Sequence, residues 1–107
     1  MIKQTFTTPL YGVEFEVRIY EDEGEIKPKE TANDYKDRIG FVSTTNDNIL
    51  MVLNQYHKLT NGEIAHECKH LVNEIILNFG GKLDLNNDEM ECYLLQWVID
   101  EVHELIK

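Results

Sequence analysis

The sequence predicts an α+β fold, in which an N-terminal antiparallel sheet of about three to four strands packs against a C-terminal helical hairpin. In the first half of the chain, apolar residues alternate with polar ones, which is the pattern of a strand with one buried face. In the second half, apolar residues recur at three- and four-residue steps, which is the period of an amphipathic helix. The 107 residues are enough for one core, so we expect a single domain over residues 1–107.

Residues 1–56 are expected to contain the strands and one acidic loop. The clearest strand is residues 13–20, and residues 5–8 are its candidate partner across a turn. Residues 21–36 are dense in charge and contain a glycine and a proline, as expected of a long solvated loop. Residues 41–53 are predicted to form a hairpin, because the turn sequence Asn-Asp-Asn separates two apolar runs.

Two helices are predicted next, over residues 60–80 and 87–106. Thr60 followed by Glu63 matches the capping box that starts a helix, and a Gly-Gly pair marks the end of the first helix. One apolar stripe runs along that helix: Ile64, Cys68, Leu71, Val72, Ile75 and Phe79. Apolar residues surround most of the second helix, so we expect it to be largely buried.

The charge of the chain argues against two classes of partner. Its 20 acidic and 10 basic side chains give a formal net charge of −10. Nucleic acids and anionic membranes are bound by clustered lysine and arginine, so neither is expected as an electrostatic partner. No apolar run approaches the roughly 20 residues of a membrane-spanning helix.

The expected location is the cytoplasm. The first residues lack the basic and then apolar order of a secretory signal. Cys68 and Cys92 are too few for a disulfide framework, and both fall at apolar helical positions, where a free cysteine acts as a small hydrophobic residue.

The sequence His66-Glu67-Cys68-Lys69-His70 is an HExxH motif within the first predicted helix. Residues four apart lie on the same side of a helix, so both imidazoles can bind one cation. Glu67 sits at the edge of that face, where its carboxylate can reach a water on the metal. This arrangement is typical of zinc hydrolases and predicts Zn²⁺ as cofactor.

A catalytic zinc site needs a third protein ligand from elsewhere in the chain. The candidates are His57, Asp88, Glu89, Glu91 and His103. Glu89 is preferred, because it begins a polar stripe on the otherwise apolar second helix. The stripe consists of Glu89, Tyr93, Gln96, Asp100 and His103. Either its first turn faces the histidines of the first helix, or the whole stripe faces water; Glu91 remains the alternative ligand.

The HExxH motif followed by a helical glutamate about twenty residues downstream resembles the gluzincin branch of the zincin metallopeptidases, and its minimal single-domain members most. Residues 87–97 are also similar to a stretch in small zinc-peptidase proteins of bacteriophages and prophages. The resemblance covers residues 63–97. It implies His66, His70 and Glu89 as zinc ligands and Glu67 as general base. It also implies an edge strand beside the cleft, for which we expect residues 49–53.

Two departures from the larger gluzincins concern Tyr93. It occupies the position of an acid that supports a ligand histidine in those enzymes. The second departure is that no downstream histidine or tyrosine is clearly placed to stabilise the oxyanion. Tyr93 is a candidate for that role, although a buried tyrosine bonded to a backbone carbonyl is the favoured interpretation.

The predicted function is zinc-dependent hydrolysis of a peptide or protein substrate, by a zinc-bound water and Glu67 as base. The alternative is a catalytically silent, zinc-stabilised binding or regulatory module of phage origin. A phage-encoded chain would act in the host cytoplasm. The substrate and the oligomeric state do not follow from the sequence.

Overall fold

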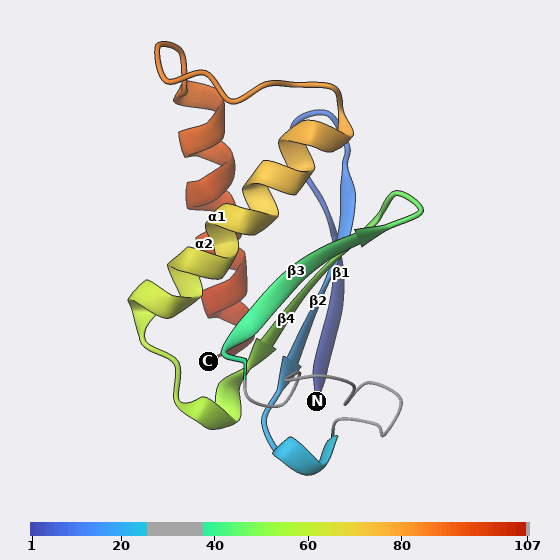
Figure 1. The fold of residues 1–107 in the computed structure, drawn as a ribbon, viewed down its shortest axis with the longest axis vertical. Coiled ribbons are helices and arrows are strands. Elements are labelled where there is room, and N and C mark those ends of the chain that lie inside the picture. The colour runs from blue at the N-terminus through green and yellow to red at the C-terminus, as the bar shows by residue number, and fades with distance from the viewer. Residues whose placement is uncertain (26–37, 107) are drawn as a thin grey trace.

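The computed structural model describes residues 1–25 and 38–106, so residues 26–36 of the predicted acidic loop lie outside the described residues. Four strands are followed by two long helices, which confirms the predicted α+β fold (Figure 1). In chain order, the elements are β1 (Ile2–Thr7), β2 (Glu14–Tyr20), the 3-10 helix η1 (Glu23–Glu25), β3 (Gly40–Thr45), β4 (Asn48–Asn54), the 3-10 helix η4 (Gln55–His57), α1 (Asn61–Asn78) and α2 (Glu89–Ile106).

The four strands form one mixed sheet in the order β1-β2-β4-β3. β1 pairs with β2, and β3 with β4, in antiparallel fashion, as predicted. The central pair, β2 and β4, is parallel, so the prediction of an antiparallel sheet is wrong there. The β3-β4 hairpin turns at Asn46 and Asp47, which both have a positive φ, as a tight two-residue hairpin turn requires.

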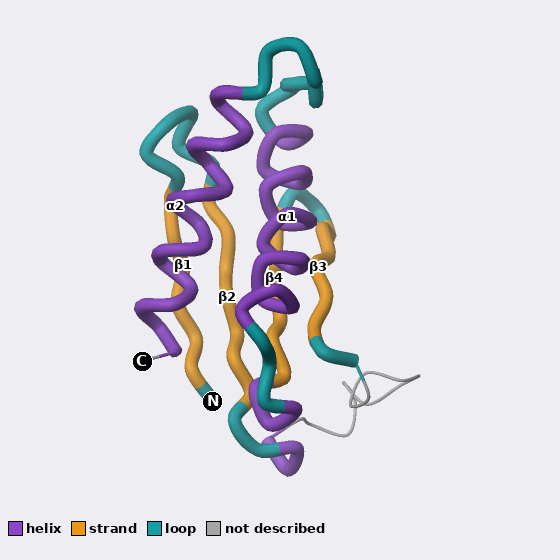
Figure 2. Tube along the Cα trace, turned by 90° about the vertical axis from the view of Figure 1, so that its left-hand side faces the viewer, coloured by secondary structure: helices purple, strands orange, loops and turns teal. Residues whose placement is uncertain are grey.

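Both helices lie on the same face of the sheet, each over a different half (Figure 2). α1 contacts β4 and β3. α2 lies over β1 and β2, where the Trp97 ring meets Phe6 and Phe15 edge-on. The core between the layers contains the alternate side chains of the strands and the predicted apolar stripe of α1.

α2 is less buried than predicted. Its buried residues are Leu94, Val98 and Val102, because the helix packs on β1 and β2 through one face and leaves much of its remaining surface to solvent. Cys92 is exposed as well, which differs from the apolar position expected for it.

The ends of α1 are formed by the predicted local signals. The Thr60 hydroxyl accepts a hydrogen bond from the Glu63 amide at 3.1 Å, and the Glu63 carboxylate accepts one from the Thr60 amide at 2.9 Å. Together these two bonds are the predicted capping box. After α1, Gly80 has a φ of 81°, a conformation that glycine adopts without strain.

β3, and not β4, is the edge strand beside α1. The expectation that residues 49–53 form that edge is therefore wrong. Met51, Val52 and Leu53 have no exposed surface, and an unbroken apolar run of this kind suits an inner strand with both faces covered. The edge position falls to β3, which is the more polar strand of the hairpin.

Gly40, the first residue of β3, allows the strand to come close to β4 and α1. A Cβ at this position would lie 2.4 Å from the Val52 carbonyl oxygen and 3.3 Å from Cγ of Glu67. The Val52 oxygen belongs to the backbone of the paired strand, so it cannot move without displacing β4. Gly40 therefore fixes the spacing between β3 and the helix that carries Glu67.

We expect Gly40→Ala to destabilise the protein by about 1–3 kcal/mol, because the added methyl group overpacks a closed site. Gly62→Ala is the matched control. Its Cβ would come no closer than 3.8 Å to Thr60, within the first turn of α1, where alanine is favoured over glycine by about 0.5–1 kcal/mol. In urea denaturation, the free energy of unfolding should therefore fall in Gly40→Ala and rise in Gly62→Ala. Equal stability of Gly40→Ala and the parent would contradict the close approach at β3.

Candidate metal centre

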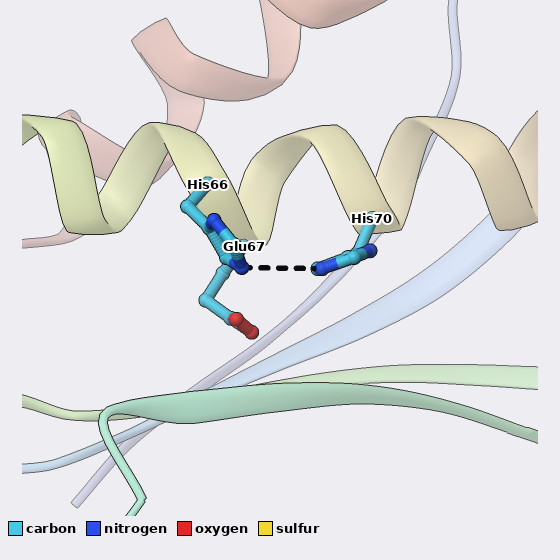
Figure 3. A group of neighbouring side chains, drawn as sticks. All are labelled: His66, Glu67 and His70. Carbon is cyan, nitrogen blue, oxygen red and sulfur yellow. Dashed lines mark hydrogen bonds between the residues drawn. The ribbon is translucent and has the colours of Figure 1, made fainter.

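Three side chains of the HExxH motif come together on α1. Ligand atoms of His66, Glu67 and His70 all lie within 4.8 Å of one another. Figure 3 shows the two rings turned toward each other and the carboxylate extending from the same side of the helix toward β3. Among residues 1–25 and 38–106, this is the one group of three such side chains with the spacing of a metal site.

The distance between the two imidazoles suits a tetrahedral ion. Nε2 of His66 and Nε2 of His70 are 3.3 Å apart, and the rings are inclined by 77°. A zinc ion bonded to both at about 2.0–2.1 Å with a tetrahedral angle would set the two nitrogens roughly 3.3–3.4 Å apart. Both histidines are exposed, so further positions around the ion would be open to water or to another ligand.

Glu67 differs from the histidines in its burial. Its side chain is only 6% exposed and lies between α1 and the start of β3, close to Gly40. Such a carboxylate has few neighbouring positions to move into. It is held at the edge of the histidine pair, where the sequence predicts a general base.

Two hollows open on either side of Glu67, along the groove between β3 and α1. The first encloses about 510 Å³ and includes His66 in its lining, and the second encloses about 370 Å³ and includes His70. Arg38, Gly40 and Glu67 line both hollows. The three motif residues therefore lie along one groove beside an edge strand.

The structure does not bring Glu89 into this group. The Lys69 ammonium donates a hydrogen bond to the Glu91 carboxylate at 2.6 Å, so Glu91 faces α1. Residues two apart on a helix do not face the same way, so this ion pair turns Glu89 away from α1. Glu89 is exposed, and its role as the third ligand stays a prediction.

The polar stripe of α2 faces mainly water. Glu89, Gln96 and Asp100 are exposed, and His103 is half-buried. Tyr93 is 67% exposed, so the expectation of a buried tyrosine at this position is wrong. It lies on the solvent side of the helix because its neighbour Leu94 takes the buried position.

The remaining candidate ligands also lie outside the group. His57 belongs to η4 and packs against the Tyr56 ring, and Asp88 immediately precedes α2. Cys68 is buried in the core and is not part of the group, and burial raises the pKa of its thiol to about 12.

Known proteins give no guide to this site. Comparisons with protein-family models, with curated proteins and with solved structures each found no match. Among the described residues, neither α1 nor α2 combines the length and apolar character needed to cross a bilayer.

Sequence reasoning missed the groove residues at and just before the start of β3. Arg38 and Gly40 belong to no catalytic motif. They lie beside Glu67 because β3 pairs with β4, which brings a segment distant in the sequence next to α1. A usable signal was present in Gly40 itself, because a glycine within a strand often marks the close approach of another backbone.

Proposed function

We propose that this protein is a zinc-dependent peptidase, in which His66 and His70 bind the ion and Glu67 is the general base. The observation that carries the proposal is the 3.3 Å separation of the two Nε2 atoms, with the Glu67 carboxylate in the same group. Purified without added zinc, the protein should contain about one equivalent of the metal and cleave an unfolded protein, and a chelator should remove both properties.

Glu67 has two tasks in the proposed reaction. When bound, zinc would lower the pKa of a water toward roughly 7 and polarise the substrate carbonyl. Glu67 takes a proton from the water as the water oxygen bonds to the carbonyl carbon of the substrate. It then passes that proton to the amine as the carbon–nitrogen bond breaks. Its burial supports this role, because a confined carboxylate keeps a fixed position relative to both partners.

The groove supports a peptide as the substrate. β3 is an edge strand, so its outer backbone groups can pair with an extended peptide as an additional strand. Such a peptide would run between β3 and α1, past Glu67. A folded protein segment would first have to become extended, so unfolded substrates should be cleaved faster.

Glu89 is retained in the proposal as the third ligand, which requires the first turn of α2 to leave its present orientation. The Lys69–Glu91 pair that holds this turn is partly exposed, and such pairs contribute only about 0–1 kcal/mol. A zinc–carboxylate bond could therefore replace it.

We expect Glu89→Ala to weaken zinc binding at least about tenfold. Glu91→Ala is the matched variant, and it should bind zinc as tightly as the parent or more tightly, because it releases the turn. Titration with a competing chelator measures both affinities. Equal affinity of Glu89→Ala and the parent would remove Glu89 from the site.

The second candidate function is a zinc-stabilised binding module without turnover. It is favoured by the placement of Glu67 as the one carboxylate grouped with the histidines in the described structure. If Glu67 itself filled the third position, no base would remain. Bound zinc, a lower melting temperature with chelator and no cleavage of any unfolded protein would support this function.

The cytoplasm, of the host if the chain is phage-encoded, remains the proposed location. Both cysteines are free thiols, which suits a reducing compartment.

A further inference from the structure

Among the residues that the structure describes, Arg38 is the one arginine or lysine that lines the groove beside the metal centre. It belongs to the lining of both hollows that flank Glu67, whereas no other arginine or lysine of residues 1–25 and 38–106 does. The described carboxylates that share these hollows are Glu63, Glu67 and Glu74. In a chain with a net charge of −10, an arginine at this point places one positive charge among three carboxylates.

The backbone at Arg38 is held in place by a buried side chain. Asn54, which has no exposed surface, donates a side-chain hydrogen bond to the Arg38 carbonyl oxygen at 2.8 Å. Its backbone amide donates another to the Ile39 carbonyl oxygen, also at 2.8 Å. These bonds fix residues 38 and 39 to the end of β4, so the guanidinium extends from an anchored position.

Two of the three neighbouring carboxylates have other hydrogen-bond partners. Glu63 is engaged in the capping box with Thr60, and Glu74 accepts a hydrogen bond from the Thr44 hydroxyl at 3.0 Å. None of the ion pairs between described residues includes Arg38. Arg38 is exposed, so a ligand that enters the groove can reach its side chain.

We infer that Arg38 selects peptides that present a carboxylate close to the scissile bond, either the C-terminal carboxylate or an acidic side chain. This inference takes its substrate class from the proposed function. A guanidinium binds a carboxylate through two parallel N–H···O bonds, which fixes orientation as well as charge. A singly charged carboxylate is favoured over a phosphate, because three carboxylates nearby repel a dianion more strongly.

The test is direct binding of short fluorescent peptides, measured by anisotropy. Four peptides of one sequence combine a C-terminal acid or amide with an internal Asp or Asn. They are titrated with the parent protein, Arg38→Gln and Arg38→Lys, each with zinc and after chelation. Arg18→Gln is the matched control, because Arg18 is the other arginine of the chain and pairs with Glu16 on β2.

The parent should bind one acid form about ten- to a hundredfold more tightly than the uncharged peptide, which is the range for charge-assisted hydrogen bonds. Arg38→Gln should lose this preference, Arg38→Lys should restore part of it, and Arg18→Gln should keep it. Peptides that differ only at the C-terminus, and peptides that differ only at the internal residue, show which carboxylate is bound. Thermal melting shows that each variant is folded.

Three results would overturn the inference: no preference in the parent, an unchanged preference in Arg38→Gln, or a preference that disappears with the metal. The last would show that the ion, not Arg38, binds the carboxylate. A preference that persists in a protein without zinc or cleavage would support Arg38 while removing the proposed peptidase. The two proposals can therefore fail separately.

Discussion

Replacing Glu67 with glutamine is expected to lower peptide cleavage at least about a hundredfold while bound zinc stays near one equivalent. Glutamine has nearly the same size and shape as glutamate, so it fits the buried site between α1 and β3 without a new cavity. It cannot accept the proton of the attacking water. Metal analysis and cleavage of an unfolded protein, measured on the same preparation, check both parts of the prediction.

Glu74→Gln is the matched control for this experiment. Glu74 lies on the same helix, lines the same groove, and accepts a hydrogen bond from Thr44 that a glutamine oxygen can also accept. Its cleavage rate should stay close to that of the parent. If Glu67→Gln cleaves as fast as the parent, Glu67 is not the general base. A variant that loses its zinc as well would show that Glu67 is a ligand, as the silent binding module requires.

The features that the sequence predicted well are those that local interactions determine. α1 begins at a capping box formed by Thr60 and Glu63, and the tight turn after it lies at Gly80, so each boundary depends on residues within one turn of it. The placement of His66 and His70 follows from helical spacing alone. Because a helix fixes which residues share a face, the grouping of the motif could be predicted without knowledge of the sheet.

The features that were missed depend on contacts between distant segments. β3 and β4 are both short strands with apolar residues, and their order in the sheet follows from the pairing of β4 with β2. The orientation of α2 depends on the packing of Leu94, Val98 and Val102 into the core, and the Lys69–Glu91 pair is consistent with it. A helical period predicts a polar stripe, but tertiary packing decides whether that stripe faces a neighbouring helix or water. Glu89 and Tyr93 are therefore the residues for which sequence and structure differ most.

His70→Ala is expected to reduce bound zinc from about one equivalent to background, because one imidazole and water do not replace two imidazoles at this affinity. His103→Ala is the matched control, since it removes a half-buried histidine of α2 from outside the group. It should keep its zinc. Metal analysis after dialysis against buffer without zinc gives the stoichiometry of each protein.

Thermal melting gives an independent check on the same variants. His70 is exposed, and exposed substitutions change the unfolding free energy by only about 0.5 kcal/mol or less, so metal-free parent and metal-free His70→Ala should melt at similar temperatures. Zinc at about 100 times its dissociation constant should stabilise the parent by roughly 2.7 kcal/mol and leave the variant unchanged. Equal stabilisation of both proteins would place the ion elsewhere. That outcome would leave the 3.3 Å approach of the two rings as an ordinary histidine contact, with no metal between them.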